Sequence, residues 1–354
     1  MADRTLLVPG TQATNLADQN GKIVYNAVRV SVGLQKDDLG GRPPSEWQAL
    51  LSTEHRPGLW APTKTSLEPG TEVTEHSVVG TPYDRMLSFA EPWPYDWRLD
   101  MRYNALKLLR YLERNAPQEG RWNLIAHSQG GIIIVLASKL ASRVDDFAHL
   151  VGRVVLVGAP LAGTMRATEA ILWGSTGLGA DQVDAARGMA RTWPALYQMM
   201  PSWRAVLDKD GNEAPDDQQL VQPGGWPGAW GTGIQDDLLL RTREVQALLH
   251  GPMSNFGPSM LARAVLGKKQ MSPVTLVRNG NDLPADRNQM ASQLGDSLVP
   301  AQRTLDWGGT MYANHVLLLT GKPERHAMLC QDEDVVATTK KFLKQKTPPA
   351  PASA

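Results

Sequence analysis

One cysteine, Cys330, is the whole thiol content of this 354-residue chain. A single cysteine excludes an internal disulfide and any zinc site built from several cysteines, and it fits a reducing compartment. No stretch reaches the roughly 18 consecutive apolar residues that a membrane-spanning helix needs, and no basic segment followed by an apolar core marks a signal peptide. We therefore expect a cytoplasmic protein.

The sequence also lacks net charge. Lys and Arg together number 36, and so do Asp and Glu, which makes the formal net charge zero. Without a global field, the chain has no electrostatic preference for nucleic acid or for an anionic membrane. No His-x-x-x-His pair or carboxylate cluster indicates a metal site. We expect no nucleic-acid partner, no metal and no cofactor.

Short apolar runs bounded by glycine or proline recur along the chain. They are rich in Val and Leu and apolar at consecutive positions, which is typical of strands buried on both faces of a parallel sheet. The runs lie at residues 5–10, 122–128, 153–160 and 273–280. Helices are expected between the first three, over 101–115 and after residue 128. This alternation predicts an α/β fold with a doubly wound, mostly parallel sheet.

Residues 164–272 interrupt the alternation. They mix Trp, Met, Gly and Pro around short helical stretches and do not repeat strand and helix. We predict that they form a mainly helical cap, or lid, inserted into one core that consists of residues 1–163 and 273–344. Pro and Ala dominate residues 345–354, which predicts a disordered tail.

Residues 126–130, Ala-His-Ser-Gln-Gly, have the pattern of a nucleophile motif. They follow an expected strand and precede an expected helix, where a sharp turn lifts the serine hydroxyl above the sheet and helix N-terminal amides face a developing oxyanion. The usual form is Gly-x-Ser-x-Gly, and here Ala126 takes the first small position. We predict that Ser128 is a nucleophile, against the alternative of a plain structural turn.

A serine nucleophile needs a base and an acid, which follow it in the order Asp then His in this arrangement. Of the seven histidines, only His315 and His326 lie late enough and outside the expected cap. His315 is favoured because it opens an apolar run, whereas His326 lies in a charged stretch typical of a surface. Asp282, Asp286 and Asp296 are candidates for the acid, and spacing alone does not separate the first from the last; either could be a turn cap.

The loop after the first expected strand supplies backbone amides for an oxyanion hole. The N–H groups of Gln12 and Gln129 could face one oxyanion, and such donors are worth roughly 3 kcal/mol each. Thr11 in the same loop is a candidate for substrate binding. So are Trp226 and Trp230 in the expected cap, where Trp and Met suit an acyl substrate, although a large aromatic side chain can equally pack the cap onto the core.

Five segments in this order resemble the lecithin:cholesterol acyltransferase family, which includes lysosomal phospholipase A2-type enzymes. The most specific is Tyr-Asp-Trp-Arg, in which Asp96 and Arg98 are expected to form an internal pair that either shapes the site or simply stabilises the fold. Residues 195–203 also resemble a cap segment of bacterial members. The five segments are residues 6–16, 94–100, 126–131, 158–164, and 295–300 together with 314–319.

This resemblance implies an α/β-hydrolase fold with Ser128 as nucleophile, Asp296 as acid and His315 as base, and with the oxyanion amides named above. It implies a lipase, esterase or phospholipase that acts on a small or lipid-like acyl ester with transient membrane contact. The chain departs from the family in two ways. One cysteine cannot form the disulfide of secreted members, and residues 18–62 hold no clear counterpart of the hydrophobic membrane-docking segment.

The same residues are compatible with two other functions. An acyltransferase would pass the acyl group from serine to an alcohol, and it differs only in how the cap shields the acyl-enzyme from water. A non-catalytic binding protein could use the same scaffold, but a decayed enzyme usually loses one triad member and none is missing here. The predicted function is therefore ester hydrolysis by a serine nucleophile.

Overall fold

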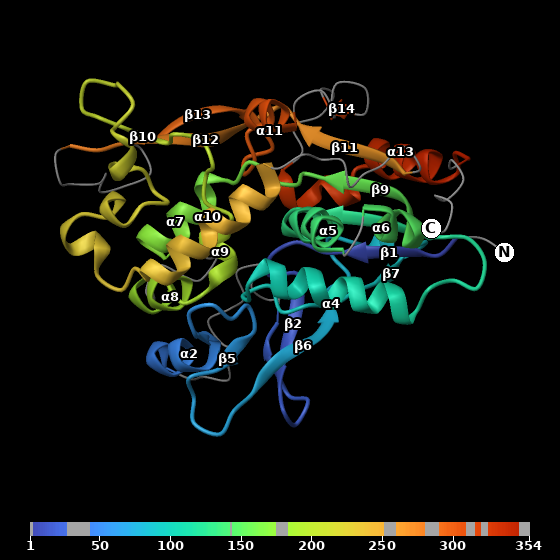
Figure 1. Ribbon diagram of the computed structural model, residues 1–354, viewed down its shortest axis with the longest axis horizontal. Coiled ribbons are helices and arrows are strands. Elements are labelled where there is room, and N and C mark those ends of the chain that lie inside the picture. The colour runs from blue at the N-terminus through green and yellow to red at the C-terminus, as the bar shows by residue number, and fades with distance from the viewer. Residues whose placement is uncertain are drawn as a thin grey trace.

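The computed structural model describes residues 3–26, 43–141, 144–174, 183–250, 260–279, 290–308, 316–319 and 325–346. Its centre is a six-stranded sheet in the order β14-β11-β9-β8-β1-β7, and every neighbouring pair is parallel (Figure 1). The predicted α/β architecture with a parallel sheet is confirmed. In sheet order the strands are β14 (Val316–Leu319), β11 (Leu261–Gly267), β9 (Val151–Val157), β8 (Trp122–His127), β1 (Thr5–Val8) and β7 (Glu91–Pro92).

The two middle strands, β8 and β9, are buried along their whole length. Their sequences are nearly continuous apolar runs because helices cover both faces of a parallel sheet and no position points to water. The register pairs Ala126 with Leu156 and His127 with Val157. The carboxyl ends of the two strands therefore meet side by side, and the residues that follow them, Ser128 and Gly158, share one edge of the sheet.

Two helices lie side by side in front of the sheet in Figure 1, α4 (Met101–Arg114) and α5 (Gln129–Leu140). The predictions of a helix over 101–115 and of one after residue 128 are confirmed. Asp100 is the N-cap of α4, and its side chain accepts a hydrogen bond from the Arg102 N–H. α5 is apolar on all sides, and a helix of that kind is buried. Within the described part of the chain, no helix is both long and apolar enough to cross a membrane.

The segment between β9 and β11 is mainly helical and gathers at one end of the sheet (Figure 1). One expectation about it differs from the structure. Residues 261–267, which we assigned to the cap, form β11 inside the main sheet, so the core resumes earlier than residue 273. The helices are α7 (Met165–Trp173), α8 (Val183–Ala190), α9 (Pro194–Gln198) and α10 (Asp236–His250), with short 3-10 turns η2 (Asp216–Gln218), η3 (Pro223–Gly225) and η4 (Gly228–Gly231).

Within the described residues, three small sheets flank the core. The run at 273–280 is expected from the sequence to form a core strand. Its residues 273–277 lie instead in β12, which pairs with β10 and β13 and not with the main sheet. The sheets are β10 (Val206–Leu207), β12 (Gln270–Val277) and β13 (Met290–Gly295); β3 (Ile23–Tyr25), β2 (Thr14–Asp18) and β6 (Val73–Val78); and β4 (Glu54–His55) with β5 (Pro62–Lys64).

Further helices lie around these elements in the described ranges. They are α2 (Pro44–Leu51), α3 (Asp84–Leu87), α6 (Val144–Leu150), α11 (Ala301–Gly308), η6 (His326–Gln331) and α13 (Glu333–Leu343). Of the predicted disordered tail, residues 347–354 lie outside the described part of the chain.

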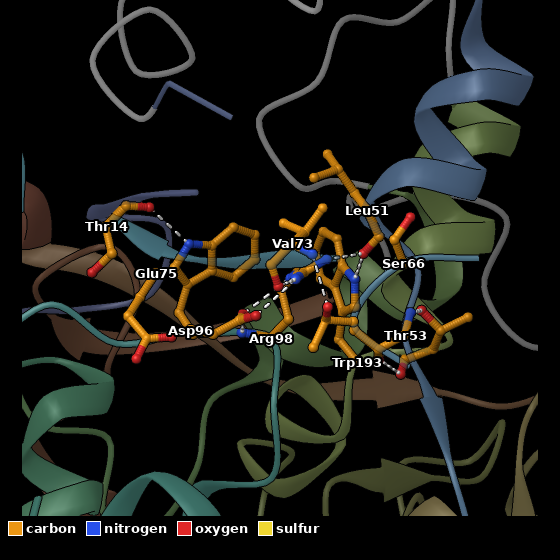
Figure 2. A network of polar contacts seen from close by, with 12 residues as sticks. Thr14, Leu51, Thr53, Ser66, Val73, Glu75, Asp96, Arg98 and Trp193 are labelled. Atoms are coloured by element: carbon orange, nitrogen blue, oxygen red, sulfur yellow. Dashed lines mark hydrogen bonds and ion pairs between the residues drawn. The ribbon is translucent and has the colours of Figure 1, made fainter. Parts of the chain in front are cut away.

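A buried ion pair joins three distant segments (Figure 2). The side chains of Asp96 and Arg98 are 1% and 0% exposed, and two guanidinium nitrogens of Arg98 lie 3.0 and 2.7 Å from the carboxylate oxygens. Arg98 Nη1 also donates to the Leu51 carbonyl (2.9 Å), which accepts from the Trp193 indole as well (2.7 Å). Arg98 Nη2 reaches the Val73 carbonyl at 3.4 Å. The expected internal pair therefore fixes the end of α2 and the start of β6 against the core.

Candidate active site

Ser128 occupies the sharp turn between β8 and α5. Its backbone has φ 53° and ψ −127°, a positive φ that costs energy for any residue with a Cβ. The turn is held because the Ser128 N–H donates to the Val157 carbonyl at 3.0 Å and the Ser128 carbonyl accepts from the Gly131 N–H at 2.9 Å. The strand, turn and helix required of a nucleophile elbow are therefore all present.

Two glycines after the serine allow the elbow to pack this closely. A Cβ on Gly130 would lie 2.3 Å from the Val8 carbonyl oxygen, and one on Gly131 would lie 2.4 Å from the Ala159 Cβ. Both distances are far below van der Waals contact. The first turn of α5 thus sits directly against the ends of β1 and β9, and only glycine fits at either position.

A carboxylate and an imidazole meet beside this elbow. Asp296 follows β13 and is buried, and its Oδ1 accepts the backbone N–H groups of Leu298 (3.1 Å) and Val299 (2.7 Å). Its Oδ2 lies 2.7 Å from Nδ1 of His326, and the His326 N–H donates to the Asp296 carbonyl at 2.8 Å. A neutral His326 that donates from Nδ1 keeps its lone pair on Nε2, and that atom has no hydrogen-bond partner among the described residues.

His326 is the histidine that sequence reasoning set aside. The expectation that it lies on the surface was wrong, because the residue is only 6% exposed. The charged residues before it suggested a surface, whereas the apolar residues after it, of which Leu329 and Cys330 are fully buried, were the signal to follow. His315 lies outside the described residues, as do Asp282 and Asp286. The assignment of His315 as base stays a prediction, and it is His326 that the structure pairs with Asp296.

The predicted oxyanion loop lies against the elbow. Gln12 has a positive φ of 63°, and a Cβ on Gly10 would lie 2.9 Å from the Ser128 Cβ. Side chains hold the loop there, since Thr11 Oγ1 donates to Gln129 Oε1 (2.8 Å) and Gln129 Nε2 donates to the Trp97 carbonyl (3.1 Å). Gln129 is the first residue of α5, where the helix itself does not use the backbone N–H. The loop and the start of α5 therefore meet at the elbow, and the role of the two backbone N–H groups as oxyanion donors stays a prediction.

Comparison with known proteins adds to this geometry. Residues 75–225, which include the elbow, match the model of the family described as lecithin:cholesterol acyltransferase. The matched segment covers less than half of the 354-residue chain, and over that segment the chain is similar to this family. No curated protein matches the sequence. Asp296 and His326 lie beyond the matched segment, so the family match and the contact between these two side chains are independent observations.

Solved structures match this chain along nearly its whole length. A chain in the crystal structure of the Tle4–Tli4 complex covers 97% of this chain and 99% of its own, with 14% identity and a TM-score of 0.58. The mature lipase BlEst2 of Bacillus licheniformis covers 97% of this chain and 92% of its own, with 10% identity and a TM-score of 0.33. At 14% identity the first match shows a shared fold alone.

Ser128 and His326 line one cavity of about 600 Å³. Thr11, which was predicted to bind substrate, and Gln12, which was predicted to supply an oxyanion amide, line it too, and both roles stay predictions. Its far walls come from two helices of the segment between β9 and β11, α7 and α9, and they are mostly apolar. The helical wall residues are Arg166, Ala167 and Ala170 of α7 with Leu196 and Met199 near α9.

The two tryptophans proposed for substrate binding are not brought to this cavity. The Trp226 indole is buried and donates to the Leu220 carbonyl at 2.7 Å, and Trp230 lies half-buried, with its carbonyl accepting from Arg191. Both take the alternative role of packing. The tryptophan that lines the cavity is Trp193, which the sequence did not distinguish from its neighbours in the same Trp- and Met-rich stretch.

His127, next to the nucleophile, is excluded as the base by its surroundings. It is buried, and burial together with the neighbouring His326 lowers the pKa of His127 to about 3. Both of its ring nitrogens are already hydrogen-bonded, Nδ1 to the Tyr83 hydroxyl (2.7 Å) and Nε2 to the His326 carbonyl (3.0 Å). A base needs a free lone pair, and of these two neighbouring histidines only His326 has a ring nitrogen without a hydrogen-bond partner among the described residues.

Proposed function

We propose that this protein is a carboxylic ester hydrolase that uses Ser128 as nucleophile, His326 as base and Asp296 as acid. The observation that carries the proposal is the 2.7 Å contact between His326 Nδ1 and Asp296 Oδ2, made by a histidine that lines the same cavity as the elbow serine. Nucleophile, base and orienting carboxylate are the parts that acyl transfer through serine requires.

In the first step, Nε2 of His326 takes the proton of Ser128 Oγ while Oγ attacks the ester carbonyl carbon. A bond forms between Oγ and that carbon, and the carbonyl π electrons move onto the oxygen. The backbone N–H groups of Gln12 and Gln129 donate to this oxyanion. Asp296 holds the Nδ1 proton and stabilises the imidazolium that results.

In the second step, the bond from the carbonyl carbon to the leaving alcohol oxygen breaks, and His326 returns its proton to that oxygen. Ser128 then carries the acyl group as an ester. Water, deprotonated by the same Nε2, attacks this ester and releases the carboxylic acid and free Ser128. Every proton is thus carried by one imidazole, which is why its orientation by Asp296 matters.

An acyltransferase is the second candidate, and the observation that favours it is the matched family, whose description names an acyltransferase. The two reactions share every residue and differ only in whether water or an alcohol attacks the acyl group on Ser128. Adding a primary alcohol to the assay separates them. Ester product that forms at the expense of free acid would establish transfer, and free acid alone would establish hydrolysis.

Labelling with a fluorophosphonate tests the proposed nucleophile. We expect the wild type to gain the mass of one probe less that of the HF released, and to hydrolyse p-nitrophenyl butyrate. Ser128→Ala should do neither, because only an activated serine attacks the phosphorus centre and displaces fluoride. Intact-mass spectrometry and absorbance measure the two. A wild type that folds but is neither labelled nor active would contradict the proposal and favour the binding-protein alternative.

The apolar cavity walls indicate an ester with an apolar acyl chain, and Ala170 on α7 tests this. Phenylalanine at Ala170 would fill space that the acyl chain needs, so we expect kcat/KM for a dodecanoyl ester to fall by about tenfold or more relative to that for a butanoyl ester. Trp226→Ala is the matched control, since Trp226 does not line the cavity. Equal losses on both esters in Ala170→Phe would place the acyl chain elsewhere.

A further inference from the structure

A chain of three buried hydrogen bonds runs beside the proposed triad, and its residues Gly10, Tyr83 and His127 line the same cavity. The Gly10 N–H donates to the Tyr83 hydroxyl at 2.9 Å, the hydroxyl lies 2.7 Å from His127 Nδ1, and His127 Nε2 lies 3.0 Å from the His326 carbonyl oxygen. Tyr83 and His127 are both buried. The proposed chemistry uses neither of these two side chains.

The direction of every bond in this chain is fixed by its ends. The His326 carbonyl can only accept, so His127 Nε2 carries a proton. A neutral imidazole has one N–H, and its Nδ1 must therefore accept from the Tyr83 hydroxyl. That hydroxyl, having donated its proton, accepts from the Gly10 N–H. Because burial keeps the pKa of His127 at about 3, this single tautomer persists across the pH range in which a histidine base works.

The chain ties together the three segments that the reaction needs. The first segment is the loop that holds Gly10 and Gln12. The second is the end of β8, where His127 directly precedes the nucleophile, and the third is the backbone of the proposed base, His326. The backbone N–H of His326 donates to the Asp296 carbonyl, and the backbone carbonyl of His326 accepts from His127 Nε2. Both backbone polar groups of His326 are therefore hydrogen-bonded. The rings of His127 and His326 also lie against each other, with centroids 4.8 Å apart.

We propose that Tyr83 and His127 are positioning residues that hold the oxyanion loop and the base in register with Ser128. This inference rests on the proposed hydrolase function. It assigns to His127 a role beyond filling the core, namely the coupling of two catalytic segments through one imidazole. Misplacement of reacting groups by about 1 Å can cost about 100-fold in rate, so the effect of cutting the chain should appear in kcat.

Steady-state kinetics on p-nitrophenyl butyrate, with active sites titrated by the fluorophosphonate, tests this role. We expect Tyr83→Phe and His127→Ala each to lower kcat per titrated serine by about 10- to 100-fold with little change in KM. His127→Gln should recover part of the loss, since its amide can donate to the His326 carbonyl from the place of Nε2. The double variant should lose less than the product of the single losses, because both changes cut one chain.

Tyr197→Phe is the matched control, since Tyr197 is equally buried and its hydroxyl donates to the Arg191 carbonyl outside the cavity. Its kcat should match that of the wild type. A Tyr83→Phe enzyme with wild-type kcat, a loss that appears only in KM, or losses that multiply in the double variant would each overturn the positioning role. An inactive wild type would instead refute the hydrolase function itself, so the two failures are distinguishable.

Discussion

Replacing His326 by alanine is expected to lower kcat/KM for p-nitrophenyl butyrate by about 10⁴-fold, because the side chain is the only proton carrier of the proposed reaction. The prediction follows from the pairing of His326 with Asp296 at 2.7 Å and from Nε2 on the opposite side of the ring, which has no partner within the described part of the chain. Stopped assays at high enzyme concentration, with the same amount of folded protein for each variant, measure the loss.

His315→Ala is the decisive control for this prediction. It removes the histidine that the sequence and the family resemblance favoured, and we expect its kcat/KM to stay close to that of the wild type. The reverse result, a large loss in His315→Ala and a small one in His326→Ala, would return the base to His315 and assign the pairing with Asp296 a structural role. Comparable large losses in both would show that each histidine is needed.

The second large effect concerns stability. Arg98→Met is expected to lower the free energy of unfolding by about 3–5 kcal/mol, because it leaves the Asp96 carboxylate buried without its counter-ion and the Leu51 and Val73 carbonyls short of a donor. Urea unfolding followed by tryptophan fluorescence measures the change. Removing the charge on both sides, in Asp96→Leu with Arg98→Met, should restore part of it, since no uncompensated ion then remains.

A surface ion pair provides the comparison for Arg98. Arg204 lies near Glu213 (2.8 Å), and its side chain is 40% exposed, so water screens the interaction. Arg204→Met should cost less than about 1 kcal/mol. If Arg98→Met were no more destabilising than Arg204→Met, the network in Figure 2 would contribute little to the stability of the fold.

The sequence identified the parts of the fold whose signal is local. β1, β8 and β9 are short apolar runs, and α4 has an apolar stripe, so each could be predicted from its own residues. β11 could not, because Arg263 breaks its apolar run. The guanidinium of that arginine lies over the Phe342 ring at 4.8 Å, a contact with a residue far along the chain. Tertiary packing decided the assignment of this strand.

The residues of the candidate site also differ in how far local sequence predicts their position. The turn at Ser128 could be predicted because the elbow motif is contiguous with the strand before it and the helix after it. The partner of Asp296 could not, because the choice between two histidines depends on which of them lies beside the carboxylate in space. Trp193 and Trp226 illustrate the same limit, since both are buried in the same helical segment and only the packing of α7 and α9 gives one of them a place in the cavity wall.

The contact between His127 and His326 spans 199 residues of sequence, and this separation affects how activity appears during synthesis of the chain. A growing polypeptide that has formed β8 and α5 carries the serine turn, yet it has neither the carboxylate nor the imidazole. Closing so long a loop is entropically costly and comes late in folding. Ester hydrolysis would thus begin only after η6 has emerged and docked, so that catalytic turnover would report complete folding and shortened chains would stay inert.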